Sequence, residues 1–263
     1  GRGLRLTGVS LFNRVSDCTA YGNAKEGFYF HRASGVTADV CRVYSNRGYG
    51  MFISACALTL IEECDVFVNQ TAEIYLISDI NYNDGNPVLS SGGTIRHCNI
   101  FGNPRDGLMA HNYARFWVVE SCNIVANAGY GAYAVLNAFP FVFRNNNFFA
   151  NGRCAFWSNP SVNKLYATGW DVNAIPQCVG NLGANPDYAA RACEGGFERL
   201  YATSPCLGAG ADGLAIGRAR PAVAPVSDKT YYVDAAAGDD ARTPAEAANP
   251  ATPWATVRRA ADA

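Results

Sequence analysis

Three side chains suited to proton transfer stand at or near the ends of short apolar segments of this chain. His31 ends the segment FYFH, His111 ends LMAH, and Asp79 stands two residues after IYLI. A histidine and a carboxylate that face one another can serve as general acid and general base. Histidines at the ends of strands are more often solvated or capping residues, so this alternative stands beside the catalytic one. In either case, elements far apart in the sequence must position these side chains.

Large apolar side chains, mostly aromatic, occupy a second set of positions in the same segments. Alternation along a strand places Phe28 and its equivalents on one face and the next residue of each segment on the other. These next residues are Tyr29, Phe52, Tyr75, Met109, Tyr133 and Trp157. An exposed row of this kind is typical of a binding surface. It predicts a glycan groove or a lateral protein interface, unless residues 79–92 and 160–218 cover it.

A repeat sets the spacing of these segments. Six hexapeptides align without gaps: CTAYGN, CRVYSN, CDVFVN, CNIFGN, CNIVAN and NNFFAN. Their last residues are Asn23, Asn46, Asn69, Asn103, Asn127 and Asn151, at steps of 23, 23, 34, 24 and 24 residues. A period near 23 with strand-like alternation predicts an all-β fold, a parallel β-solenoid with one coil per repeat. The longer third step predicts an insertion loop over residues 79–92.

Stacked coils place equivalent residues above one another, about 4.8 Å apart. Asparagine tolerates the left-handed backbone of a tight turn, and its amide can donate to one neighbour and accept from the other, so the six asparagines predict a ladder. Five cysteines at one shared offset predict a column of buried thiols; they are Cys18, Cys41, Cys64, Cys98 and Cys122. The sequon at Asn69 falls in the ladder, which favours a structural role over glycosylation.

Cysteines outside this column leave the disulfide question open. The chain has ten cysteines but no C-x-x-C spacing that would indicate a metal site. Four of the remaining cysteines are Cys154, Cys178, Cys193 and Cys206, and one disulfide among them stays an unassigned alternative.

Composition excludes several classes of partner. The chain is 49% hydrophobic and 16% charged with a formal net charge of −1, and it has no cluster of Lys or Arg. Nucleic acid and anionic membrane surfaces are therefore not expected partners.

The longest apolar stretch, YGAYAVLNAFPFVF, contains Asn and Pro and is too short to span a bilayer. Because neither an initiator Met nor a signal peptide begins the chain, a mature or excised segment is expected.

With these repeats the chain resembles the right-handed parallel β-helix proteins of the pectate-lyase-like superfamily. Residues 185–218, which begin NPDYAARACEGG, are similar to the closing segment of such domains, and residues 230–263, which begin TYYVDAAAGDD, are similar to their opening segment. The order is permuted, since the opening segment comes last. The resemblance implies four parts: coils over 1–160, a closing segment over 161–218, a Pro-rich linker over 219–229, and a strand-plus-helix cap over 230–263.

The permuted order predicts a way for copies of the chain to associate. An uncovered solenoid end invites pairing with another chain, and a head-to-tail contact that does not close gives a fibre. The expected intersubunit cap residues are Tyr231, Tyr232, Val233, Trp254 and Val257. An alternative is that residues 230–263 fold back onto the chain's own first coil. The favoured function is a structural subunit or tandem repeat of an extracellular or cell-surface assembly, whose partners are copies of itself.

The alternative function is a polysaccharide-binding or polysaccharide-cleaving β-helix, and it makes extracellular polysaccharide a partner. Lyases of the superfamily typically bind calcium through clustered carboxylates. The nearest group here is Glu62, Glu63 and Asp65, which do not all share one face of a strand. Paired aspartates on adjacent strands, which the glycosidase branch needs, do not occur in the coils. No cofactor is therefore expected, and whether the chain is an enzyme stays open, with the balance against it.

Overall fold

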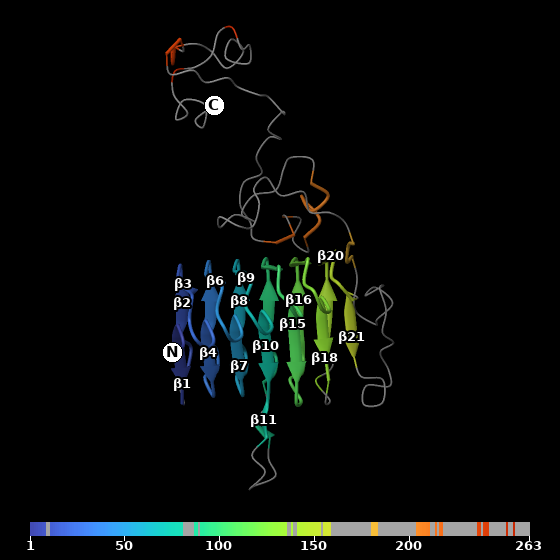
Figure 1. Ribbon diagram of the computed structural model, residues 1–263. Helices are drawn as coiled ribbons and strands as arrows, with labels where there is room; N and C mark the ends of the chain where they lie inside the picture. Colours follow the sequence, from blue (N-terminus) through green and yellow to red (C-terminus); the bar gives the residue numbers. More distant parts are fainter. Residues whose placement is uncertain are drawn as a thin grey trace. The chain divides into compact units, whose positions relative to one another are not determined.

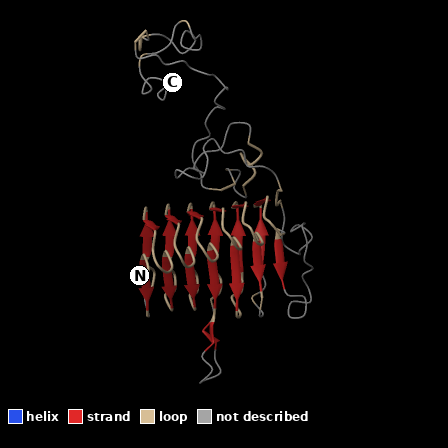
Figure 2. Ribbon diagram, viewed as in Figure 1, coloured by secondary structure: helices blue, strands red, loops and turns tan. Residues whose placement is uncertain are grey.

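The computed structural model divides the chain into two units, Gly1–Val223 and Ala224–Ala263. It describes residues 1–8, 11–80, 87–88, 90–135, 138, 141–153, 155–158, 180–183, 204–210, 214, 216–217, 236–237, 239–241, 251 and 255. In the first unit, short strands stack into a regular ladder of coils, and each full coil contributes one strand to each of three sheets (Figures 1 and 2).

The first sheet has seven parallel strands, one from each successive coil. In spatial order they are β1 (Leu4–Thr7), β4 (Phe28–His31), β7 (Met51–Ser54), β10 (Ile74–Ile77), β15 (Leu108–His111), β18 (Ala132–Ala134) and β21 (Phe156–Ser158). Neighbours pair without slippage, so Phe28 lies over Met51 and Met51 over Ile74. This sheet carries His31, His111 and the row of large apolar residues from Tyr29 to Trp157.

The other two main sheets have six parallel strands each. The second contains β2 (Arg14–Ser16), β5 (Thr37–Asp39), β8 (Leu60–Glu62), β13 (Thr94–Arg96), β16 (Trp117–Glu120) and β19 (Phe141–Arg144). The third contains β3 (Thr19–Tyr21), β6 (Arg42–Tyr44), β9 (Asp65–Phe67), β14 (Asn99–Phe101), β17 (Asn123–Val125) and β20 (Asn147–Phe149). The predicted all-β parallel solenoid is confirmed.

The insertion in the fourth coil forms a small antiparallel hairpin of β11 (Asp79–Ile80) and β12 (Pro87–Val88). It projects from the end of β10 in Figure 1.

No helix occurs among the described residues, and the predicted cap residues Tyr231, Tyr232, Val233, Trp254 and Val257 lie outside them. In the second unit, the Ala241 N–H donates to Asp239 Oδ1 at 2.9 Å and the Ala255 N–H to Asp240 Oδ1 at 2.9 Å.

The core follows from the stacking of apolar residues at equivalent positions of successive coils. The inward residues of the first sheet are almost wholly buried: Phe28, Met51, Ile74, Leu108, Ala132 and Phe156. The cysteine column lies in the same core, and its members Cys41, Cys64, Cys98 and Cys122 are fully buried free thiols, while Cys18 at the end is partly exposed. Each buried thiol is within 3.2 Å of a backbone carbonyl two residues earlier. Cys206 is also a buried free thiol, whereas Cys154, Cys178 and Cys193 lie outside the described residues.

The asparagines form a ladder along the corner between the third and first sheets. Asn23 donates its backbone N–H and its amide Nδ2 to Asn46 Oδ1 at 3.0 and 2.8 Å, and Asn46 donates in the same way to Asn69. Asn127 repeats the pair of bonds to Asn151. Asn69 is 0% exposed, so its sequon is closed to glycosylation in the folded protein.

Replacing Asn46 with alanine is expected to lower the free energy of unfolding by about 3 kcal/mol, because the two Asn23 donors then lose their acceptor and the Ala20 carbonyl loses its side-chain donor. The measurement is chemical denaturation followed by far-UV circular dichroism. Asn23→Ala is the matched control; Asn23 is partly exposed at the first step of the ladder, and a loss of about 1 kcal/mol is expected. Equal losses of unfolding free energy for the two variants would contradict the claim that the buried asparagines of the ladder stabilise the fold more than the partly exposed one.

Candidate functional site

The six predicted stripe residues form one continuous row on the outer face of the first sheet. Strand register aligns them in this order: Tyr29, Phe52, Tyr75, Met109, Tyr133 and Trp157. Tyr75 is 8% exposed and the other five are partly exposed. The rings of Tyr29 and Phe52 stack at 5.0 Å, and those of Tyr133 and Trp157 at 4.8 Å. Met109 stands between the two aromatic groups.

A second, shorter row of tyrosines widens this surface. Tyr49 and Tyr130 each precede the glycine that leads into a strand of the first sheet. The Tyr49 ring stacks on Tyr75 with 4.5 Å between centroids, and the Tyr130 ring lies 5.3 Å from Tyr133. The surface therefore consists of two aromatic platforms, one on either side of Met109.

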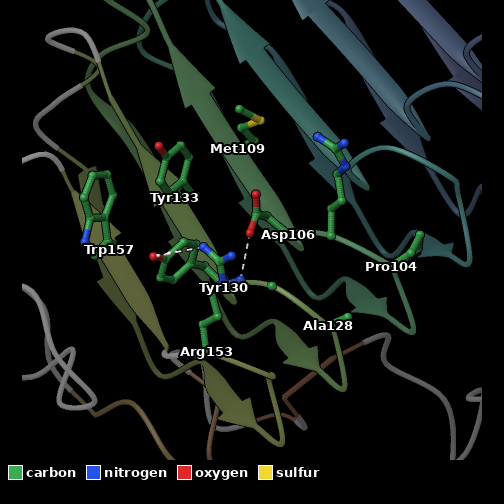
Figure 3. A pocket seen from close by; sticks show the side chains of 10 residues that line it. Pro104, Asp106, Met109, Ala128, Tyr130, Tyr133, Arg153 and Trp157 are labelled. Carbon is green, nitrogen blue, oxygen red and sulfur yellow. Dashed lines mark hydrogen bonds between the residues drawn. The ribbon is translucent and has the colours of Figure 1, made fainter.

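A groove lies at the second platform (Figure 3). It has a volume of about 390 Å³. Its lining residues come from three consecutive coils and are Pro104, Arg105, Asp106, Met109, Ala128, Gly129, Tyr130, Tyr133, Arg153 and Trp157. The turn that follows each ladder asparagine supplies the charged side chains, and the adjoining strand supplies Met109, Tyr133 and Trp157. Aromatic faces and charged groups are thus brought to one concave surface.

Asp106 is the carboxyl group of this groove. Its Oδ1 accepts the backbone N–H of Tyr130 at 2.7 Å. A Cβ at Gly129 would lie 2.3 Å from the same oxygen, so only glycine lets the carboxyl approach the backbone there. Burial raises the pKa of Asp106, while the bond from Tyr130 and the charges of Arg153 and Arg105 oppose the rise. The result is a partly buried acid in contact with the aromatic platform.

Two guanidinium groups flank the carboxyl. Arg153 lies over the Tyr130 ring, 5.1 Å from its centroid, and its Nη1 donates to Tyr130 Oη at 3.4 Å. Arg105 is exposed on the neighbouring turn. The lining therefore has two positive groups against one carboxyl. Burial is also the main cause that raises the pKa of Tyr133, so its hydroxyl stays protonated and can both donate and accept hydrogen bonds.

This arrangement suits a sugar chain. Flat aromatic faces accept the apolar C–H faces of sugar rings, while the Asp106 carboxyl and the tyrosine hydroxyls can bond sugar hydroxyls. Guanidinium groups bind carboxylates with charge-assisted hydrogen bonds. A half-buried platform with a few convergent polar groups is typical of a ligand site.

The predicted proton-transfer residues come from three different coils. His31 and His111 share one column of the first sheet, but Ser54 and Ile77 lie between them, so they are about 14 Å apart at the usual strand spacing. Asp79 begins β11 in the coil that precedes His111. The His111 ring lies 5.8 Å from that of Tyr75, and burial lowers the pKa of His111. The two histidines therefore form no acid–base pair with each other.

The described part of the closing segment packs on another sheet. Asn123 Nδ2 donates to the Ile216 carbonyl at 2.8 Å, and the Gly217 N–H donates to the Ser121 carbonyl at 2.6 Å. Asn123 belongs to an outward column of the third sheet, together with Asp65, Asn99 and Asn147. Among the described residues of 204–217, these contacts cover the third sheet and not the aromatic row.

Sequence reasoning missed Asp106, Tyr130 and Arg153. A signal was present, because these residues occupy the short turn between each ladder asparagine and the following strand. The turn lies beside the aromatic row in every coil, so its variable positions were candidates for the site. Within the part of the chain that the structure describes, no group of three His, Cys, Asp or Glu side chains is placed to hold a metal ion.

Comparison with known families identifies the class of this protein. A family model described as "Right handed beta helix region" matches residues 3–88 and 76–169, which together are more than half of the chain. The chain belongs to this family, in agreement with the predicted right-handed β-helix. A search of curated proteins gave no match.

A solved structure has the same fold. The crystal structure of the periplasmic alginate epimerase AlgG matches with a TM-score of 0.51 and 19% sequence identity. The match covers 66% of this chain and 38% of the epimerase. At this identity the likeness extends to the fold alone. Among the described residues, no helix is long and apolar enough to cross a membrane.

Proposed function

We propose that this protein binds an acidic polysaccharide along the outer face of its first sheet, outside the cytoplasm. The observation that carries the proposal is the groove in which Tyr130, Tyr133 and Trp157 adjoin Asp106, with Arg105 and Arg153 at its edge. The rings give area for stacking, and the excess of positive charge favours sugars that carry carboxylates. The fold is shared with a periplasmic alginate epimerase, which is consistent with both the ligand class and the location.

Binding is proposed rather than hydrolysis because of the titratable groups in the groove. Hydrolysis by general acid and base needs two converging groups of suitable pKa. The described lining has a single carboxyl, Asp106, and its other titratable side chains are Tyr130, Tyr133, Arg105 and Arg153. Burial raises the pKa of Tyr133, so its hydroxyl stays protonated. The groove is therefore built to hold a glycan.

Affinity electrophoresis tests this proposal directly. The protein is run through gels that contain a polyuronate, a neutral glucan or no polysaccharide. Retardation by the polyuronate alone is expected, and it should weaken as salt screens the two guanidinium groups. Migration that none of the polysaccharides changes would contradict the proposal, as would equal retardation by the neutral glucan.

A second candidate is a subunit of a head-to-tail assembly, and the end of the solenoid favours it. The outer edge of β1 pairs with no described strand. Leu4, Leu6 and Cys18 are only partly buried there, beside a hollow of about 370 Å³. Residues 230–263 of another copy are the proposed cover. If so, the full chain forms assemblies in light scattering and negative-stain images, whereas a chain that ends at Val226 stays monomeric. Monomers in both cases would rule this candidate out.

A further inference from the structure

One step of the asparagine ladder differs from the others. Elsewhere the backbone N–H of one asparagine donates to the Oδ1 of the next, but Asn69 does not bond Asn103. Instead the Asn69 backbone N–H donates to Glu73 Oε1 at 3.3 Å, and Asn69 Nδ2 donates to Glu73 Oε2. Glu73 occupies the position that is Gly27, Gly50, Gly107 and Gly131 in other coils. Its side chain is 0% exposed, so a carboxyl group has been inserted into the ladder.

The insertion leaves a buried acceptor without a donor. Asn103 is 2% exposed, and its Oδ1 has no hydrogen bond. Its Nδ2 donates to the Asp106 carbonyl at 2.7 Å and to the Thr71 carbonyl at 3.3 Å. A buried polar atom that lacks a partner destabilises the folded state, because it has lost its hydrogen bonds to water. Some donor at this step would remove this destabilisation.

Among the described residues, no charged side chain pairs with Glu73. Its hydrogen-bond partners are the Asn69 amide and the backbone N–H groups of Asn69 and Val68. The titratable and charged groups on the adjoining turns are Arg47 and Tyr49 in the preceding coil and Arg105 and Asp106 in the following one. Arg47 and Arg105 are exposed, the Tyr49 ring stacks on Tyr75, and the Asp106 carboxyl bonds the Tyr130 N–H. Burial without a countercharge favours the neutral form of a carboxyl group.

We propose that Glu73 is a protonated, uncharged acid in the native protein at neutral pH, and that its O–H is the donor that Asn103 Oδ1 lacks. The acid then continues the ladder, accepting from Asn69 below and donating to Asn103 above. The direction of its pKa is consistent, since burial raises the pKa of Glu73 well above its ordinary value. When Glu73 loses this proton, a buried carboxylate faces an amide oxygen, and the step becomes repulsive.

This step is therefore a pH-sensitive joint between two coils. The Glu73 N–H donates to the Asp106 carbonyl at 3.3 Å, and the Ile74 N–H donates to the Gly107 carbonyl at 3.1 Å. Asp106 lines the groove, so the joint lies directly beside the proposed binding surface. Loss of the proton at alkaline pH is expected to loosen the contact between the coil of β10 and the coil of β15.

Carbon-13 NMR of the wild-type protein with labelled glutamate carboxyls tests the protonation state without a substitution. One glutamate carboxyl is expected to remain protonated through neutral pH and to titrate only in the alkaline range. Aspartates carry no label, so Asp106 cannot be mistaken for it. Titration of every glutamate in the acid range, near its ordinary pKa of about 4.3, would overturn the proposal.

Stability against pH tests the consequence, with Glu73→Gln as the matched variant. A glutamine amide accepts from Asn69 and donates to Asn103 at every pH. The folded-state pKa of Glu73 lies above the unfolded value, so the wild type keeps its full stability below that unfolded value. Between the two pKa values its folding equilibrium constant falls about tenfold per pH unit relative to Glu73→Gln. The pH-sensitive joint would be contradicted if the ratio of the two folding equilibrium constants, wild type to Glu73→Gln, stayed constant from about pH 5 to pH 9.

Discussion

Replacing Tyr133 and Trp157 together by alanine is expected to weaken the binding of an acidic oligosaccharide by a factor of roughly 30 to 150, equivalent to about 2–3 kcal/mol. The two rings stack at 4.8 Å and form one wall of the groove. Both side chains point outward from the first sheet, so their truncation removes contact area for the ligand without opening a core cavity. Isothermal titration calorimetry of the wild type and the double variant measures the loss.

Tyr21→Ala is the matched control for this pair. Tyr21 is 63% exposed and stacks on Tyr44 at 5.2 Å, but it lies on the third sheet, away from the groove. Its replacement is expected to leave oligosaccharide affinity unchanged. Equal affinities for the wild type and the groove variant would show that the platform does not bind the ligand.

Replacing Trp117 by alanine is expected to cost about 3–5 kcal/mol of unfolding free energy, the range found for a large aromatic side chain removed from a core. Trp117 is 0% exposed, and its Nε1–H donates to the Ser90 carbonyl at 3.2 Å. A Cβ at Gly93 would lie 2.4 Å from the ring, so the indole fills the space beneath that glycine completely. Alanine would leave a cavity between neighbouring coils and remove one of two hydrogen bonds to the Ser90 carbonyl, which also accepts the Arg115 N–H at 3.0 Å.

Denaturant unfolding followed by circular dichroism gives the size of this effect. Trp117→Phe is the comparison variant, since it keeps most of the buried area and loses only the indole N–H and part of the ring. Its expected cost is less than half of that for alanine. A loss below about 1 kcal/mol for Trp117→Ala would mean that the coil packing described here is not what stabilises the solenoid.

The fold could be predicted because a solenoid forces equivalent residues into register. The recurrence of Asn23 and its equivalents, with an apolar strand after each, is explained only if successive coils stack, and the structure stacks them. The cysteine offset and the outward aromatic row depend on that same register. The single long step likewise located the insertion near Asp79, where the structure has a hairpin.

The groove was not predicted because it depends on turns, which the repeat leaves free to vary. Asp106, Tyr130 and Arg153 come from three different coils, and their contacts depend on side-chain direction in addition to register. His31, Asp79 and His111 were singled out because they stand at or near the ends of strands. Two coils separate His31 from His111 along the solenoid axis, whereas Asp79 lies on the coil next to that of His111.

Glu73 shows a different limit of sequence reasoning. In the aligned repeats, Glu73 stands at a position that is glycine in most of the other coils. Only the structure shows that its carboxyl replaces Asn103 as the acceptor for Asn69. The same applies to the outward column of Asn99 and Asn123, whose role depends on the Ile216 and Gly217 backbone that covers it.

Fluorine NMR of protein labelled with fluorotryptophan tests the central claim most directly. The chain has four tryptophans, which single Trp→Phe substitutions assign. Trp157 lines the groove, and buried Trp117 is an internal control. Titration with an acidic oligosaccharide is predicted to shift the Trp157 signal in a saturable way and to leave the Trp117 signal in place. A Trp157 signal that does not move under saturating oligosaccharide would contradict the binding groove.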